Sequence, residues 1–212
     1  MKKMIALAVV AGSLATAAQA ATIVVNQGAY SFGNGGEFNA TISGVGFTPL
    51  ALTNSGSFET FCLEVPENFQ PGATYNVTID LAADAGGNGG QVGSTDPLDE
   101  RTAYLYSLFI TGNLAGYDYA DSLGQRKNNA GALQNAIWYL ENEVGTLDSA
   151  EAIAYYNASL AGIGQGLGLV RVANLYDNAG GKHQSQLIAI PTPGVLAGFA
   201  AAGVFASRRR RA

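Results

Sequence analysis

The 212-residue chain has very few of the residues that form disulfides, metal sites and catalytic dyads. It contains one cysteine, one histidine and one tryptophan. A single cysteine cannot form an intramolecular disulfide, and one cysteine with one histidine cannot complete a usual zinc site. The glycine-rich segments lack the GK[ST] ending of a phosphate loop. We therefore expect neither a metal nor a cofactor.

Positive charge is scarce in the central part of the chain. All sixteen acids lie between residues 21 and 190, where only five lysines and arginines oppose them, so that part has a formal net charge of −11. An acidic surface argues against a nucleic-acid partner and favours solubility outside the cell. A segment of about 170 residues is long enough for one domain with a substantial core.

Both ends of the chain have the composition of targeting segments. Residues 1–20 combine two lysines, a short apolar run and Ala18-Gln19-Ala20, which is typical of a cleaved secretory signal. Residues 191–212 begin with Pro191-Thr192-Pro193-Gly194 and continue as a twelve-residue apolar run, which ends in Arg208, Arg209, Arg210 and Arg211. Twelve helical residues cover about 18 Å, less than the roughly 30 Å of a hydrocarbon core. We expect a weak, transient inner-membrane anchor with the arginines in the cytoplasm.

The domain between these ends, residues 21–190, is predicted to be mainly β. Short alternating segments at 22–25, 30–32, 38–42, 58–65 and 75–81 are separated by Gly, Asn or Pro-Gly, and strand patterning returns at 169–176 and 186–190 around a hairpin at 178–181. The pattern indicates an α+β, mainly β fold, an antiparallel β-sandwich or a barrel-like sheet. Residues 82–96 are expected to form a flexible loop.

A helical insertion at about 97–161 is predicted to form a three-helix layer on this sheet. Asp96 and Pro97 resemble the start of a helix that ends before Gly112. A second helix is expected at about 130–143, with Gln134 near its start. Asp148 and Glu151 resemble a capping box for a third helix that runs to about residue 161.

Two short stretches carry the chemistry. Alternation in residues 58–65 places Phe61, Leu63 and Val65 on one face and Cys62 on the other, away from the expected core. In the second stretch, residues 133–141, helical spacing places Gln134 one turn before Trp138 on a stripe beside the apolar face.

These stretches resemble the thioester domains of bacterial surface adhesins. In that family a cysteine after an aromatic residue, as in Phe61-Cys62-Leu63, condenses with the glutamine of a motif similar to residues 133–138, LQNAIW; Leu133 stands where the family often has threonine. The resemblance covers about residues 58–176. It implies an internal thioester between Cys62 and Gln134, which an amine on a surface or matrix partner would open.

The C-terminal segment resembles a PEP-CTERM sorting tail, the signal read by exosortase-type processing enzymes of Gram-negative bacteria, with Thr192 where glutamate is usual. The resemblance implies export, transient anchoring in the inner membrane, processing near residues 191–194 and release to the cell surface or extracellular matrix.

Thioester formation requires the sulfur to be held against an amide carbon, because an amide is a poor electrophile. We expect Gln134 near a helix start, where free N–H groups and the helix dipole would stabilise the oxyanion. Phe61, Glu64 and Trp138 are the predicted shielding or orienting residues. The reaction is a single self-modification, so the chain is not expected to be an enzyme.

Two other interpretations stay open. In the first, the protein is a non-covalent structural component of a surface or matrix, in which Cys62 and Gln134 form no bond. More remotely, it is a cysteine protease in which Cys62 pairs with His183, oriented by Asp177. Acid pairs such as Asp118 with Asp121 lack calcium-loop spacing and are interpreted as solvated surface charge.

Overall fold

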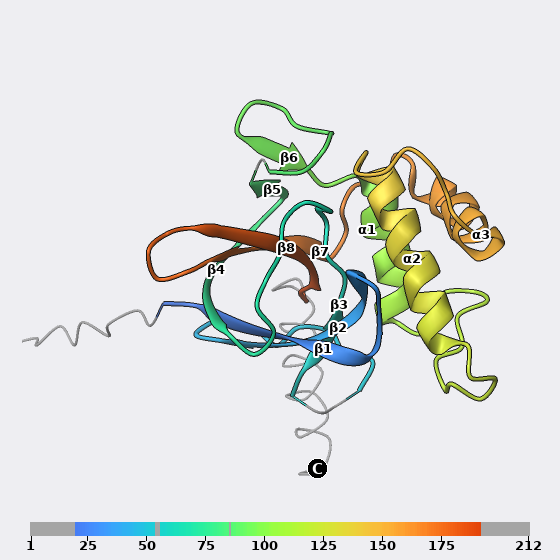
Figure 1. Cartoon of the computed structure of the whole chain (residues 1–212), viewed down its shortest axis with the longest axis horizontal. Coiled ribbons are helices and arrows are strands. Elements are labelled where there is room, and N and C mark those ends of the chain that lie inside the picture. Colours follow the sequence, from blue (N-terminus) through green and yellow to red (C-terminus); the bar gives the residue numbers. More distant parts are fainter. Residues whose placement is uncertain (1–19, 54–55, 85, 192–212) are drawn as a thin grey trace, which may run out of the picture.

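The computed structural model describes residues 20–53, 56–84 and 86–191. Most of the expected signal segment and the sorting segment from Thr192 onward lie outside these ranges. The described chain forms one antiparallel six-stranded sheet, a small two-stranded sheet and three helices (Figure 1).

The large sheet is curled, and its two ends meet. Its strands are β1 (Thr22–Phe32), β2 (Gly35–Ser43), β3 (Phe58–Thr60), β4 (Thr74–Asp80), β7 (Val170–Tyr176) and β8 (Lys182–Ala189), in the order β3-β2-β1-β4-β7-β8. Immediately after β3 the chain crosses to β8, where Leu63 N–H donates to Ser185 O (3.1 Å) and Leu187 N–H donates to Phe61 O (2.9 Å). A single curled sheet, and not two facing sheets, therefore forms. The barrel-like expectation describes it better than the sandwich.

The expected strands are largely present, with three corrections. The segments predicted at 22–25 and 30–32 belong to one strand, β1, which has a register shift between Gln27 and Ser31. The strand predicted at 58–65 is only three residues long. The segment predicted as a loop is flanked by two short paired strands, β5 (Ala82–Asp84) and β6 (Thr95–Pro97). The β7–β8 hairpin is confirmed.

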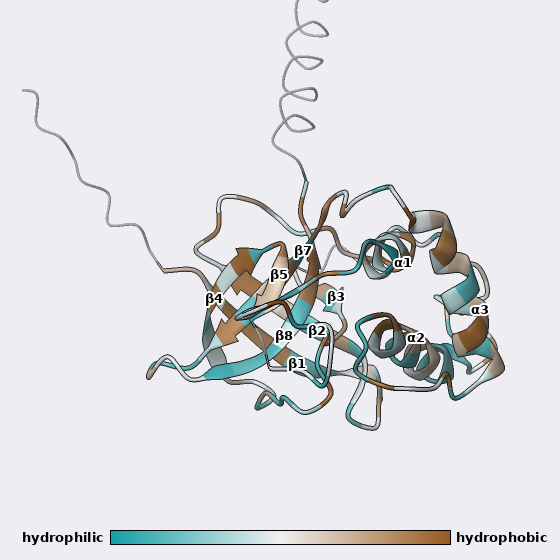
Figure 2. Ribbon diagram, turned by 90° about the horizontal axis from the view of Figure 1, so that it is seen from above, coloured by the Kyte–Doolittle hydropathy of each residue, from teal (hydrophilic) through white to brown (hydrophobic). Residues whose placement is uncertain are grey.

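The helical layer covers one side of the curled sheet (Figures 1 and 2). It consists of α1 (Glu100–Ile110), α2 (Arg126–Leu140) and α3 (Ala150–Ser159), with a 3-10 turn at Leu160–Gly162. Helix α2 packs on β1 and β2, α1 packs on β7 and β8, and α3 lies outside both. The insertion between the strands is thus as expected, and it brings α2 against the first hairpin.

The helix starts differ from the expected ones. Asp96 and Pro97 lie in β6, and the cap of α1 is Asp99, whose carboxylate accepts from Arg101 N–H at 2.7 Å. Ser149, and not Asp148, caps α3 by accepting from Ala152 N–H at 3.0 Å. The sequence offers several neighbouring carboxyl and hydroxyl caps, and the choice among them depends on where the preceding strand ends.

Two hydrophobic clusters stabilise the domain. One lies between the sheet and the helices and includes Phe61 and Leu63; the other lies inside the curled sheet and includes Phe58 and Cys62. Both faces of this stretch are therefore buried. The expectation that Cys62 points away from the core is wrong, because alternation identifies two faces and cannot show that each face meets a different core.

Candidate functional site

The candidate site lies where the side chain of Gln134 enters a gap between two extended segments. Strand β2 pairs with β3 as far as Phe38 opposite Thr60. Continuing that register by two residues would place Gly36 opposite Cys62. The ladder stops instead, because the chain after Thr60 crosses to β8 and Cys62 pairs with Gln186. The carboxamide of Gln134 occupies the position where the next hydrogen bonds between the strands would form.

The contacts of Gln134 bring together the two residues predicted for the thioester. Its Oε1 accepts from Gly36 N–H, Cys62 N–H and the Cys62 thiol, each at 3.3 Å, and its Nε2 donates to Cys62 O at 2.8 Å. The opposite amide orientation would set an NH₂ group against two backbone donors, so the hydrogen-bond network fixes which atom faces the sulfur.

The site is closed to bulk solvent, and the groups that bond to Gln134 are uncharged. Cys62 is 0% exposed and Gln134 1% exposed. Burial raises the pKa of the Cys62 thiol well above its usual range, so the sulfur is held as a neutral thiol at neutral pH. A neutral buried thiol is inert toward solvent, and its reaction depends on the group fixed beside it.

Gln134 does not lie near a helix start, contrary to expectation. It is the ninth of the fifteen residues of α2, because the helix begins at Arg126. The N–H groups of its own helix are therefore already used. The two donors to its carbonyl oxygen come from the strands, and together they form the arrangement that stabilises an oxyanion in acyl transfer.

Two glycines allow this approach, and the sequence analysis missed them. A Cβ on Gly35 would lie 2.5 Å from Gln134 Cγ and 2.8 Å from Trp138 Cη2. Gly36 has φ +89°, a conformation that side chains rarely adopt. The run Gly33-Asn34-Gly35-Gly36 could have been recognised as a turn, but its fit against a helix depends on the tertiary structure.

A charged network holds the start of α2 against β2. Arg126 donates to both carboxylate oxygens of Glu37, at 3.0 Å from Nε and 2.6 Å from Nη2, and Tyr117 donates its hydroxyl to the same carboxylate at 2.6 Å. The guanidinium also lies over the ring of Tyr30, 4.3 Å from its centroid. These residues, also missed in the sequence, fix α2 two turns before Gln134.

The three predicted shielding residues lie in different places. Trp138 is half-buried, packs on the same cluster as Cys62 and lies over Gly35. Phe61 faces the helices and meets Phe109 edge to face at 5.0 Å, so it closes the site from the far side. Each ring thus covers one side of the pair.

Glu64 is buried two residues after Cys62, and it forms hydrogen bonds with strand β8. Its Oε2 accepts from Ser185 N–H at 2.9 Å, and its backbone oxygen accepts from Gln184 Nε2 at 2.6 Å. Burial, reinforced by Glu67, raises the pKa of Glu64 to about 8. These contacts anchor the segment after Cys62 to β8, so Glu64 orients the cysteine through the backbone.

The protease arrangement does not form among the described residues. His183 Nε2 lies 3.6 Å from Asp177 and Nδ1 lies 3.2 Å from Asn68 O, whereas the Cys62 thiol bonds to Gln134. The raised pKa of Cys62 is also opposite to that of an activated thiolate. Within the described ranges, His, Cys, Asp and Glu form no group able to hold a metal ion.

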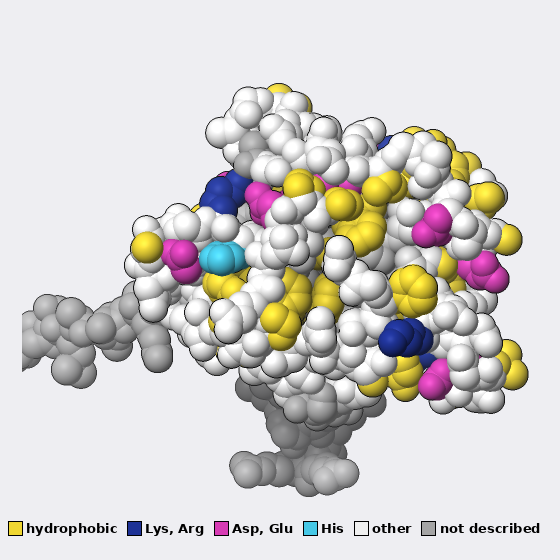
Figure 3. All heavy atoms as spheres, viewed as in Figure 1, with side chains coloured by type: hydrophobic (Ala, Val, Ile, Leu, Met, Phe, Trp, Pro, Cys, Tyr) yellow, Lys and Arg dark blue, Asp and Glu magenta, His cyan; other side chains and the backbone are white. Residues whose placement is uncertain are grey.

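Fewer acids reach the surface than the formal charge suggests. Six of the sixteen are buried, namely Glu37, Glu59, Glu64, Asp96, Glu141 and Glu143. The face in Figure 3 accordingly carries scattered charged side chains among neutral and apolar ones. The formal net charge of −11 therefore overstates the number of acidic side chains at the surface.

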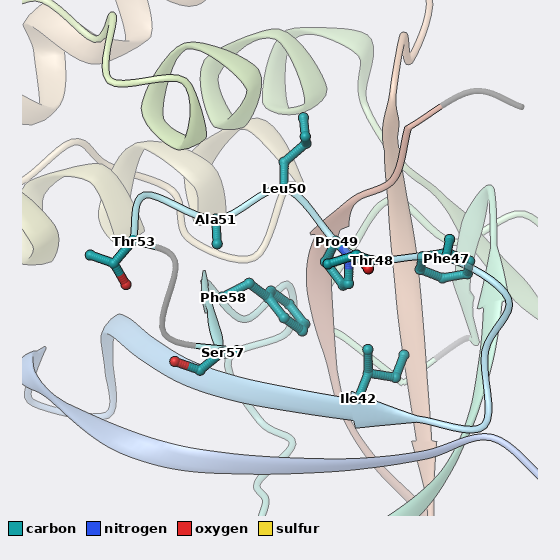
Figure 4. A pocket seen from close by; sticks show the side chains of 10 residues that line it. Ile42, Phe47, Thr48, Pro49, Leu50, Ala51, Thr53, Ser57 and Phe58 are labelled. Carbon is teal, nitrogen blue, oxygen red and sulfur yellow. The ribbon is translucent and has the colours of Figure 1, made fainter. Parts of the chain in front are cut away.

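A hollow in the described chain lies elsewhere. It measures about 560 Å³ and is formed by Ile42 of β2, Phe58 of β3 and the loop from Phe47 to Thr53, which arches over both (Figure 4). It contains none of the predicted site residues, and the pair of Cys62 and Gln134 is enclosed elsewhere.

Of the predicted sorting residues, only Pro191 is described, at the end of the chain that follows β8. Thr192, Pro193, Gly194 and Arg208 to Arg211 lie outside the described residues. None of the helices within the described ranges has the length and apolar character needed to cross a membrane.

Comparison of the chain with protein-family models, with curated proteins and with solved structures found no match in any of the three.

Proposed function

We propose that the chain is an exported surface or matrix protein in which Cys62 and Gln134 form a thioester for covalent attachment to an amine-bearing partner. The observation that supports this most directly is the insertion of the Gln134 carboxamide between two strands. There its carbonyl oxygen meets two backbone N–H groups and the Cys62 thiol at 3.3 Å.

In the proposed reaction the Cys62 sulfur attacks the side-chain carbonyl carbon of Gln134. The carbonyl oxygen becomes an oxyanion that Gly36 N–H and Cys62 N–H stabilise. The carbon–nitrogen bond then breaks, and the thiol proton leaves with the amide nitrogen as ammonia. The contact of Nε2 with Cys62 O at 2.8 Å is lost in this step.

The fold supplies most of what this step requires. Holding the two groups in contact contributes on the order of 7 to 11 kcal/mol relative to separate molecules. Exclusion of water strengthens the oxyanion contacts and slows hydrolysis of the product. Trp138 and Phe61 provide that exclusion from opposite sides.

In the second step of the proposed reaction, a primary amine attacks the thioester carbon. The carbon–sulfur bond breaks, an amide forms to the partner, and Cys62 recovers its proton as a thiol. Each molecule reacts once. The terminal segments support the location of this reaction, since they resemble a signal peptide and a sorting tail for an exosortase-type enzyme, which would release the domain from the inner membrane.

A non-covalent surface protein is the second candidate. The hydrogen bond from Gln134 Nε2 to Cys62 O favours it, because an intact carboxamide uses both its oxygen and its nitrogen in hydrogen bonds at this site. In this case the pair is a structural tie between α2 and the sheet.

Intact mass of the purified mature domain distinguishes the two. We expect a mass lower than that of the sequence by one ammonia, and a gain of one methylamine after treatment with that amine. Gln134→Glu abolishes both effects, because a carboxylate does not condense with the thiol. Gln125→Glu makes the same change on the exposed residue before α2 and should retain both.

Cys62→Ala serves as a second test, and circular dichroism establishes that each variant is folded, since both residues are buried. A folded wild-type domain of full sequence mass with a titratable thiol overturns the covalent proposal.

A further inference from the structure

The proposed thioester chemistry places negative charge on the Cys62 sulfur in both steps. In the first step the sulfur gives up its proton as it attacks the carbon of Gln134. In the second step it leaves that carbon with the electron pair of the broken bond. Burial opposes this charge, since it raises the pKa of the Cys62 thiol. A group that stabilises a negative sulfur would therefore lower the barrier of each step.

Two N–H groups oppose the effect of burial on the sulfur. Whereas burial raises the pKa of the Cys62 thiol, the N–H of Cys62 itself and the indole N–H of Trp138 lower it, because both favour the charged sulfur. The Cys62 N–H also donates to Gln134 Oε1, at 3.3 Å. The indole N–H is buried and has no hydrogen-bond partner within the part of the chain that the structure describes. It is thus the donor that is still unused beside the reacting pair.

Helix α2 and the β1–β2 turn place the indole ring at this position. Trp138 follows Gln134 by one helical turn, so the two side chains lie on the same side of α2. The ring packs on the buried cluster that contains Cys62, and its Cη2 atom lies 2.8 Å from the position that a Cβ on Gly35 would take. One helix therefore carries both the carbon that the sulfur attacks and the N–H that acts on the sulfur.

The missing hydrogen bond of the indole has a physical explanation in the reaction. A neutral thiol or thioester sulfur is a weak acceptor, and a buried N–H without a partner is unfavourable in the resting state. A negative sulfur is a much stronger acceptor, because hydrogen bonds to charged groups are strengthened. An interaction that forms only as the charge develops stabilises the transition state more than the resting state, and such interactions accelerate a reaction.

We propose that Trp138 is a catalytic residue of this chemistry, whose indole N–H donates a hydrogen bond to the Cys62 sulfur as that atom becomes negative. The inference rests on the proposed thioester. The indole keeps its proton throughout. During opening, the electron pair of the carbon–sulfur bond passes to the sulfur, which then takes the proton that the attacking amine releases. This role is separate from shielding by the ring, because shielding needs no N–H.

The test removes the N–H and keeps the shape of the ring. Trp138 is the only tryptophan in the chain, so biosynthetic replacement of tryptophan by benzothienylalanine exchanges N–H for sulfur at this one position. Intact mass against time follows opening of the thioester by methylamine. We expect the rate to fall on the order of tenfold to a hundredfold, the range for loss of a hydrogen bond to a charged group.

4-Fluorotryptophan is the matched control and should open at the wild-type rate. It keeps the N–H, and its fluorine is attached two ring atoms away from Cη2, the Trp138 atom that approaches Gly35. Circular dichroism establishes that each protein is folded. A folded benzothienylalanine protein that loses no ammonia, when the wild type does, also supports the inference, because the first step has the same requirement.

Wild-type protein that has lost no ammonia overturns both the thioester and this inference. Ammonia loss in the wild type with an unchanged opening rate in the benzothienylalanine protein overturns the role of the N–H alone. If the benzothienylalanine protein does not fold, the single indole N–H resonance of the wild type decides the question. A resonance that Cys62→Ala leaves unchanged shows that the N–H does not reach the sulfur and overturns the inference, and a displaced resonance supports it.

Discussion

Helix α2 contacts strand β2 at two places, and the two are built from opposite chemistry. At its first residue, Arg126 binds the buried carboxylate of Glu37 with two hydrogen bonds. Two turns later, Gln134 meets Gly36 through an uncharged carboxamide and one backbone N–H. The first contact involves charge and side chains from both elements, whereas the second needs glycine and the absence of a side chain.

The difference separates positioning from reactivity. A bidentate ion pair is directional and holds the register of a helix on a strand. A carboxylate at position 134 could not lose ammonia, and a charge beside the thiol would need solvation that the buried site does not provide. In the proposed mechanism the charged contact therefore stays two turns away and fixes the helix, while the neutral contact reacts.

The largest expected effect is loss of the charged contact. Glu37→Ala leaves Arg126 buried without its partner, and removal of one member of a buried pair costs about 3 to 5 kcal/mol. Glu37 and Arg126 have side chains only 4% and 12% exposed, so solvent cannot compensate. Urea unfolding at neutral pH measures the loss.

The control for this variant is Lys182→Ala, which removes a cation from a longer contact with Glu67, 3.9 Å, where the lysine is 32% exposed. Its expected cost is about 0 to 1 kcal/mol. If Glu37→Ala costs no more than this control, the charged contact does not position α2.

A comparison with two other buried carboxyls sharpens the same point. Glu64 and Glu141 take part in no ion pair within the part of the chain that the structure describes. Burial raises the pKa of each from 4.5 to about 8. Both keep their proton in the folded state at pH values where the unfolded chain has lost it.

Folded-state stability from these two protons is therefore fully present below about pH 4.5 and is lost as the pH rises through about 8. At about 1.4 kcal/mol per unit of pKa, the loss is on the order of a few kcal/mol for each group. Urea midpoints between pH 5 and 8 measure this loss of stability.

The double variant Glu64→Gln with Glu141→Gln should flatten the dependence of the urea midpoint on pH, and the control Glu151→Gln, on the exposed face of α3, should not. An unchanged slope in the double variant would contradict the raised pKa values of Glu64 and Glu141.

The sequence predicted that Cys62 and Gln134 meet, but it did not predict the backbone segments that surround them. Cysteine and glutamine motifs indicated which two side chains meet, because residue type and order are local information. The chain after Thr60 leaves β2 for β8, and this long-range choice creates the gap that Gln134 fills. The same choice makes the donors come from Gly36 and Cys62, and not from a helix start as expected.

The neutral contact can be broken by a single methyl group. Gly35→Ala places a carbon 2.5 Å from Gln134 Cγ, and overpacking of this kind costs about 1 to 3 kcal/mol. The methyl group should also displace the carboxamide from its two donors, so the fraction of molecules that have lost ammonia should fall. Gly145→Ala is the control, since an added Cβ there has open space. Complete ammonia loss in a stable Gly35→Ala domain would show that the close approach is not required.

The smallest expected effect is that of salt on the reaction with amines. Because six of the sixteen acids are buried, electrostatic attraction comes from the remaining acids and acts during approach over the outer surface. Screening shortens its range to about 10 Å at 0.1 M. A polyamine, with several positive charges, should therefore open the thioester a few-fold more slowly in 0.15 M salt than in 0.01 M, a modest case of electrostatic steering. Methylamine carries at most one charge and should show less change, and intact mass against time gives both rates. Equal salt dependence for the two amines would mean that the outer acids do not guide the partner to the thioester.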